Sequence, residues 1–325
     1  MLNAAFIGKA LRNLFIDRDR PFFAHLFVTE RCNLRCRYCE VWRDPRPELD
    51  EEGLEKTIDR LAAMGTAVLS FTGGEPLLRK ETIRLIGYAK RRGMHTKITS
   101  NGTMPRDRYR ELLESDIDAI SISMDGVGGE SALPYAKMDG RIIGNIEFMH
   151  ARRGKKKLNV STVYFGGNES AVRELVDFLE RGLPGLEVFV QPVVSGQGGA
   201  FRPGRFVHVD MDLLRELETR PSVVNPRYFN DHCAEYFRRD GRFPWGCKAG
   251  RMFFDIKPDG EFWMCQDQPT GLNVLDPGFM DAWRALDTEC LARQCSGCTY
   301  SCYVLTQKSF ELKNAQTWFT HAARL

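Results

Sequence analysis

Strand-like and helix-like runs alternate along most of this chain, and the alternation constrains its fold more than any other feature. Six runs have the pattern of strands: Phe22–Thr29, Val68–Phe71, Lys97–Thr99, Ala119–Met124, Leu158–Tyr164 and Leu186–Val194. Helical patterns separate them, at Asp50–Met64, Lys80–Arg92, Arg106–Glu114, Arg141–Arg153 and Ser170–Arg181. Repeated units of this kind build a parallel sheet that helices cover. We therefore predict an α/β fold, a partial (β/α)6 barrel of the TIM type, with a site at the carboxyl ends of its strands.

A cysteine triplet follows the first predicted strand. Cys32, Cys36 and Cys39 form the pattern C-x3-C-x2-C. Three thiolates on one loop can hold three irons of a [4Fe–4S] cluster, which leaves the fourth iron open. A structural zinc site would usually show four ligands in two pairs. The open position indicates a reactive site.

The triplet, with Tyr38 before its last cysteine, resembles the signature loop of radical S-adenosylmethionine (SAM) enzymes. The resemblance implies that the open iron binds SAM, and that SAM is cleaved to methionine and a 5′-deoxyadenosyl radical, which takes a hydrogen atom from a substrate. It also implies a flavodoxin- or ferredoxin-type electron donor, and a contact of Tyr38 with the adenine. A zinc knuckle is the alternative interpretation of the three cysteines alone.

The ends of the next three predicted strands also resemble this family. Gly73-Gly74-Glu75 belongs to a GGEP segment, which implies binding of the SAM amino group. Glycines allow close backbone approach, and a carboxylate suits an ammonium group. Ser100 and Ser123 are the expected contacts to the ribose or the methionine moiety of SAM. Ordinary turns are the alternative interpretation of each segment.

The amino-acid composition and the N-terminal sequence limit the classes of partner and the cellular location that we expect. The 325 residues include 46 basic and 43 acidic side chains, a net charge of +3 that does not indicate a nucleic-acid partner. Charged residues interrupt the apolar N-terminus, so we expect no signal peptide. The ten cysteines are then expected to be reduced thiols of a cytoplasmic iron–sulfur protein.

The first 21 residues have the spacing of an amphipathic helix, in which Phe6, Ala10 and Leu14 recur every four residues. We favour a helix that covers the bottom of the barrel. A helix on a membrane surface is the alternative.

A second set of cysteines lies near the C-terminus. Cys247 and Cys265 flank a predicted hairpin, Phe253–Ile256 and Glu261–Met264, with Gly260 in its turn. This unit resembles the start of the SPASM or twitch extension of radical SAM enzymes. Together with Cys295 and Cys298, the resemblance implies four thiolates for one auxiliary [4Fe–4S] cluster. Two assignments stay open: Cys302 or Cys290 as a further ligand, and a zinc ribbon in place of the cluster.

These features divide the chain into four predicted parts: an N-terminal helix at 1–21, the radical SAM barrel at 22–195, a linker at 196–242, and the cysteine-rich hairpin and helix extension at 243–325. The predicted function is hydrogen abstraction from a peptide, protein or natural-product substrate. A small molecule (aminosugar, nucleoside or lipid) is the alternative substrate. A zinc-stabilised binding protein and a pure electron carrier are the rival classes.

Overall fold

The computed structural model describes residues 4–16, 20–36, 38–127, 140–165, 167–193, 209, 211–311 and 314. Residues 196–208 and 210 of the predicted linker lie outside the described residues. No helix within the described part has the length and apolar character needed to cross a membrane.

The strands and helices follow the predicted order. The strands are β1 (Phe23–Thr29), β2 (Val68–Gly73), β3 (His95–Ser100), β4 (Ala119–Ser123), β5 (Lys157–Tyr164), β6 (Glu187–Pro192), β7 (Phe253–Ile256), β8 (Glu261–Cys265) and β9 (Gln268–Asn273). The helices are α1 (Ala4–Phe15), α2 (Glu51–Met64), η1 (Pro76–Leu78), α3 (Thr82–Arg91), α4 (Arg106–Glu114), α5 (Gly140–His150), α6 (Glu169–Gly182), α7 (Met211–Leu217), α8 (Arg227–Arg238), α9 (Phe279–Ala285), α10 (Thr288–Arg293) and α11 (Ser301–Ser309).

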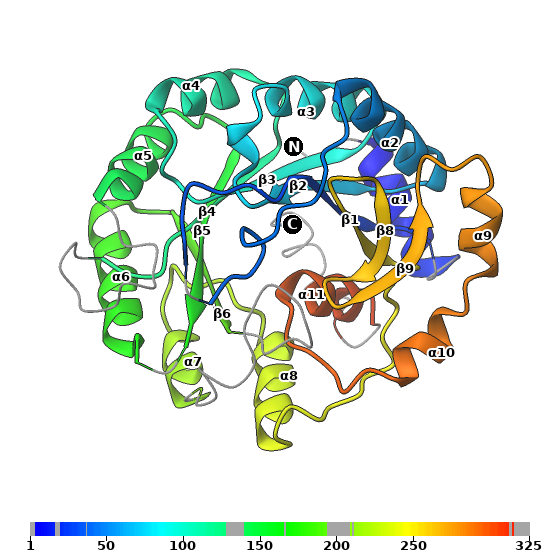
Figure 1. Ribbon diagram of the computed structural model, residues 1–325. Helices are drawn as coiled ribbons and strands as arrows, with labels where there is room; N and C mark the ends of the chain where they lie inside the picture. The colour runs from blue at the N-terminus through cyan, green and yellow to red at the C-terminus, as the bar shows by residue number, and fades with distance from the viewer. Residues whose placement is uncertain are drawn as a thin grey trace.

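One curved sheet organises the molecule. Its order is β6-β5-β4-β3-β2-β1-β7-β8-β9, and the strands from β6 to β7 pair in parallel. Figure 1 shows helices α2 to α6 around the outside of this sheet, which does not close into a complete barrel. The predicted partial barrel is confirmed, and the carboxyl ends of its parallel strands meet at one edge.

Helix α2 illustrates how local sequence builds the outer layer. The side chain of Asp50 caps its first turn, because a carboxylate oxygen accepts a 2.8 Å hydrogen bond from the Gly53 amide. Gly65 ends the helix in the left-handed conformation, with φ of 92°. Leu54, Ile58 and Leu61 recur on one face and are fully buried against the sheet.

The C-terminal hairpin extends the barrel sheet. β7 and β8 pair antiparallel, as the hairpin prediction requires, and β7 also pairs in parallel with β1. A further strand, β9, pairs with β8 and was not predicted. Helix α11 follows and lies on the inner side of the ring of helices (Figure 1). The extension therefore supplies side chains to the barrel interior.

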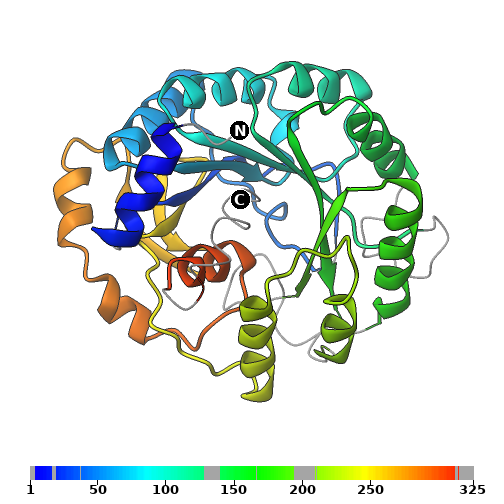
Figure 2. The same ribbon diagram turned by 180° about the vertical axis from the view of Figure 1, so that it is seen from behind.

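Helix α1 covers the amino ends of the strands, as Figure 2 shows from behind. The Phe6 ring is fully buried and lies 5.9 Å from the Phe22 ring, just before β1. The Lys9 ammonium donates a 2.8 Å hydrogen bond to the Thr66 carbonyl, just before β2. These contacts agree with a helix that covers the bottom of the barrel, although Ile7 and Leu11 on its outer face are exposed.

Candidate functional site

The cysteine triplet lies on the loop after β1, at the carboxyl edge of the sheet. Cys32, Cys36 and Cys39 are partly buried and line one cavity of about 170 Å³. The other lining residues come from the neighbouring strand ends and include several predicted SAM contacts: Tyr38, Gly73, Gly74, Ser100 and Ser123. The structure thus brings the predicted motifs to one place.

Two glycines hold the end of β2 against the cysteine loop. The Gly74 amide donates a 2.9 Å hydrogen bond to the Thr29 carbonyl. A Cβ atom on Gly73 would lie 1.9 Å from the Thr29 carbonyl oxygen, and one on Gly74 would lie 2.2 Å from that of Arg31. Only glycine fits here, because the two backbones are in contact.

Glu75 differs from the other predicted SAM contacts, because it does not line this cavity. Its carboxylate is fully buried and accepts hydrogen bonds from the amides of Leu77 (3.1 Å) and Asn101 (2.7 Å) and from the Ser100 hydroxyl (3.0 Å). Burial raises its pKa to about 7 in spite of these donors. In this arrangement Glu75 ties the end of β2 to the end of β3.

Asn101 links the end of β3 to the cysteine loop. Its side-chain amide donates a 2.8 Å hydrogen bond to Asn33 and lies 3.7 Å from the Cys32 sulfur. The Leu34 amide also donates to that sulfur, at 3.4 Å. Burial raises the pKa of the Cys32 thiol, and these two donors lower it.

Tyr38 has a definite role within the protein. Its ring is buried 5.8 Å from that of Phe165, and its hydroxyl donates a hydrogen bond to Asp125, just after β4. Asp125 in turn accepts a 3.0 Å bond from the Val163 amide of β5. The phenol therefore fixes the cysteine loop to two further strands, and an adenine contact stays a prediction.

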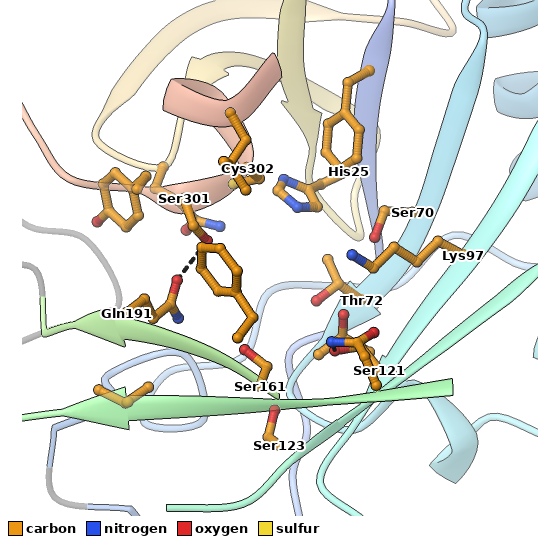
Figure 3. Close-up of a pocket in the computed structure, with 18 of the residues that line it drawn as sticks. His25, Ser70, Thr72, Lys97, Ser121, Ser123, Ser161, Gln191, Ser301 and Cys302 are labelled. Atoms are coloured by element: carbon orange, nitrogen blue, oxygen red, sulfur yellow. Dashed lines mark hydrogen bonds between the residues drawn. The ribbon is translucent and has the colours of Figure 1, made fainter. Parts of the chain in front are cut away.

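A second cavity, of about 300 Å³, occupies the interior of the barrel (Figure 3). It adjoins the first, since both are lined by Cys39, Thr72, Thr99, Ser123 and Gln191. We call it the lumen cavity. Hydroxyl side chains from several strands point into it, and the Ser301 hydroxyl of α11 donates a 2.5 Å bond to the Gln191 side chain.

His25 and Cys302 line one wall of the lumen cavity, and the buried carboxylate of Asp255 contacts the histidine. His25 Nδ1 on β1 lies 3.0 Å from Asp255 Oδ1 on β7, and Cys302 at the start of α11 hydrogen-bonds to the same imidazole. Burial opposes protonation of His25, but the interactions with Cys302 and with the Asp255 carboxylate outweigh it and raise the histidine pKa to about 10.

Four C-terminal thiols share a common backbone geometry. Each accepts a hydrogen bond from the amide two residues later: Cys247 from Ala249, Cys265 from Asp267, Cys295 from Gly297 and Cys298 from Tyr300. Burial raises the pKa of Cys247 to about 12 and those of Cys265 and Cys298 well above the usual value. Amide donors favour the charged thiolate, the form that binds metal.

The other C-terminal cysteines lie in different surroundings. Cys233 is fully buried, and burial raises its pKa, which agrees with an ordinary buried thiol. Cys290 is exposed on α10. Cys302 lines the lumen cavity beside His25. The environment of Cys302 therefore differs from that of the four amide-bonded thiols.

Within the described part of the chain, no three histidine, cysteine or carboxylate side chains are already grouped as a metal site. The donor set nevertheless suits iron–sulfur clusters, since thiolates that accept amide hydrogen bonds are their usual ligands. Cys247 and Cys295 also line a cavity of about 700 Å³ at the surface of the extension.

Comparison with known proteins supplies the family. Residues 26–181 match the model of the radical SAM superfamily. This part of the chain is a radical SAM domain. The domain begins in β1 and contains the cysteine triplet and the ends of β2, β3 and β4. The family uses SAM and a [4Fe–4S] cluster.

Curated relatives match parts of the chain. A Fe-coproporphyrin III synthase of Methanosarcina barkeri is 36% identical over 104 residues, 31% of this chain and 26% of that protein. An AdoMet-dependent heme synthase of Oleidesulfovibrio alaskensis is 29% identical over 157 residues, 47% of this chain and 39% of that protein. The chain thus spans well under two thirds of the length of these relatives.

Solved structures share the fold over most of the chain. Streptococcus suis SuiB, solved with its precursor peptide SuiA, has a TM-score of 0.63 at 17% identity. The superposition covers 92% of this chain and 75% of the SuiB chain. The protein anSMEcpe, solved with bound AdoMet and the Cp18Cys peptide, has a TM-score of 0.60 at 16% identity, over 94% and 99% of the chains.

The sequence analysis missed two charged residues of the lumen cavity, His25 and Lys97. His25 interrupts the apolar run of the first predicted strand, and Lys97 is the first residue of the third predicted strand. A charged side chain on the inward face of a buried strand is the signal that could have revealed them.

Proposed function

We propose that this radical SAM enzyme binds SAM at the cavity beneath the cysteine triplet and modifies a substrate held in the lumen cavity. The continuity of the two cavities through Thr72, Thr99, Ser123 and Gln191 is the observation that carries the proposal. A radical formed in the first cavity reacts with what lies nearest, so the adjoining interior is where a C–H bond would be placed.

The residues have distinct parts in this proposal. Cys32, Cys36 and Cys39 would hold the cluster, which when bound supplies the electron that cleaves SAM. Gly73 and Gly74 leave room for SAM by keeping side chains out of the space beside the loop. Ser100 and Ser123 offer hydroxyl groups to it, and Tyr38 holds the loop in place.

For the extension we propose one auxiliary [4Fe–4S] cluster on Cys247, Cys265, Cys295 and Cys298. Their common amide hydrogen bonds support this set over Cys302 or Cys290. Four thiolates leave no iron open, which suits acceptance of an electron from the substrate and a net oxidation or bond formation.

Substrate and partners follow by analogy. Peptide complexes are known for SuiB and anSMEcpe, which supports a peptide or protein substrate, and a small molecule is the alternative. We propose a flavodoxin- or ferredoxin-type electron donor and a reducing, cytoplasmic setting. The ten cysteines, all within the described residues, form no disulfide, which agrees with that setting.

Metal analysis after anaerobic purification tests the proposal. We expect about eight irons and eight sulfides per chain, as two [4Fe–4S] clusters require. Cys36→Ala should abolish formation of 5′-deoxyadenosine from SAM and a reductant, whereas Cys265→Ala should spare it and block product formation. Cys233→Ala and Cys290→Ala are the matched controls and should keep the full iron content. Two zinc ions per chain, or activity in Cys36→Ala, would contradict the proposal.

A further inference from the structure

Lys97 is a partly buried lysine that lines the lumen cavity. Its side chain extends from the middle of β3 into the lumen cavity (Figure 3). Among the described residues, no hydrogen-bond acceptor or carboxylate pairs with its ammonium group. Nearby lysines do find partners: Lys90 lies 2.7 Å from Asp118, and Lys9 donates to the Thr66 carbonyl. Burial lowers the Lys97 pKa, which reflects the cost of holding this charge inside the barrel.

The charged groups that the structure describes around Lys97 do not provide it with a close partner. Asp255 is engaged by His25 and by the Tyr303 hydroxyl, whose one proton is shared between the two carboxylate oxygens at 2.7 and 2.8 Å. Cys302 acts on Lys97 electrostatically but is hydrogen-bonded to His25. Glu187 is the one carboxylate among the described lining residues. It lies on β6, the edge strand of the parallel part of the sheet, which β4 and β5 separate from the Lys97 strand β3. The ammonium group is therefore available to a ligand.

Hydroxyl groups surround the same space. Those that Figure 3 shows facing the cavity from the barrel strands come from β2, β4 and β5: Ser70, Thr72, Ser121, Ser123 and Ser161. A hydroxyl can donate to an anionic oxygen, and a partly buried ammonium favours a ligand that neutralises it. His25, the other cation of this cavity, is paired with Asp255, whereas Lys97 is a cation among neutral donors, which matches an oxyanion such as a carboxylate or a phosphate group.

We propose that Lys97 and these hydroxyl groups form an oxyanion-binding site in the lumen cavity, so that the substrate is an acid that enters with its carboxylate or phosphate group against Lys97. Lys97 is two residues before Thr99, which borders both cavities. Two residues of a strand span about 6–7 Å. The oxyanion of the substrate then lies one layer of side chains below the substrate carbon that reacts with the radical, and Lys97 is a positioning residue. The position of that carbon rests on the proposed function, whereas the anion site does not depend on it.

Cys302 offers a test that needs no SAM chemistry, because its thiol lines the same cavity. The anaerobically purified, cluster-loaded protein is treated with iodoacetate or with neutral iodoacetamide, and alkylation is followed at each cysteine by peptide mass spectrometry. Exposed Cys290 on α10 is the control in the same chain. We expect the iodoacetate-to-iodoacetamide rate ratio to be roughly tenfold higher at Cys302 than at Cys290, since a charge-assisted hydrogen bond contributes on that scale.

Lys97→Met keeps the length of the side chain and removes its charge, so it should lower the ratio at Cys302 to that of Cys290. Lys56→Met, at an exposed position of α2, should leave the ratio unchanged. If acetate protects Cys302 from alkylation at a lower concentration than inorganic phosphate does, the site binds carboxylates. If phosphate protects at the lower concentration, the site binds phosphate groups. Equal ratios at both cysteines in the unaltered protein, or a ratio that survives Lys97→Met, would overturn the proposal.

A second measurement covers the case in which neither reagent reaches Cys302. Inorganic phosphate or acetate should raise the unfolding temperature of the unaltered and Lys56→Met proteins, and should not raise that of Lys97→Met. No stabilisation of the unaltered protein by either anion would overturn the proposal. Loss of 5′-deoxyadenosine formation would instead contradict the proposed function, so the two failures are distinguishable.

Discussion

His25 Nδ1 lies 3.0 Å from Asp255 Oδ1, and this contact joins the first strand of the barrel to the first strand of the C-terminal extension. The two residues are also opposite each other in the β1–β7 register. Asp255 also accepts the proton of the Tyr303 hydroxyl, which lies within hydrogen-bond distance of both carboxylate oxygens, so the same carboxylate holds α11 against the barrel interior. The lumen cavity is therefore built jointly by the barrel and the extension.

We expect Asp255→Asn to weaken this junction. The buried carboxylate has 0% exposed side-chain area, and loss of its charge weakens hydrogen bonds that contribute about 1.5–3 kcal/mol each when one partner is charged. The variant should unfold at lower urea concentration than the unaltered protein. Asp281→Asn, at an exposed site on α9, is the control and should leave the midpoint unchanged. Equal midpoints in both variants would contradict the structural role of Asp255.

Gly74→Ala should disturb the cysteine loop without unfolding the barrel. The added Cβ would lie 2.2 Å from the Arg31 carbonyl oxygen, so the loop backbone must shift. We expect a reduced iron content and weaker visible absorbance, with the far-ultraviolet circular dichroism unchanged. Gly87→Ala in α3 is the matched control, since the nearest atom there is a flexible Arg91 nitrogen at 3.6 Å. Full iron loading of Gly74→Ala would show that the contact is unimportant.

The sequence predicted the barrel well because each of its strands carries its own signal. Val68–Phe71 and Ala119–Met124 are apolar runs bounded by turn residues, and these positions indeed form β2 and β4. The cysteine triplet and the glycine pair could also be recognised in the sequence, because each motif is defined by the spacing of residues within a single loop.

Contacts between residues on different strands of the sheet could not be predicted from the sequence. His25 and Asp255 are 230 residues apart, and nothing local to either residue indicates that β7 pairs with β1. Glu75 shows the same limit, because the donors that surround it come mainly from the end of β3. Strand β9 was missed because Gln268–Asn273 is partly exposed and contains Pro269 and Gly271, which weaken a strand pattern.

Phe6→Ala should destabilise the protein, because Phe6 is the buried anchor of α1. Its ring is fully buried between Phe22 and His95, and removal of a buried phenylalanine ring costs about 3–5 kcal/mol. Ile7→Ala, on the exposed outer face of the same helix, is the control and should change stability little. The urea midpoints of the two variants check this. An equal and small effect would favour the alternative in which α1 acts elsewhere, for example on a membrane surface.

His95 should limit stability on the acid side. Burial lowers the His95 pKa to about 4, although the charge of Asp118 partly opposes this shift. The folded protein therefore keeps the imidazole neutral as the pH falls, whereas the unfolded chain takes up a proton near pH 6.5. The stability from this group is complete above pH 6.5 and is lost progressively as the pH falls through about 4. The difference in pKa corresponds to about 3 kcal/mol over this range. His95→Phe keeps a ring beside Phe6 and removes the titration, so urea midpoints measured between pH 4 and 7 should fall less steeply with acidity than those of the unaltered protein. An unchanged slope would mean that other groups control the acid dependence.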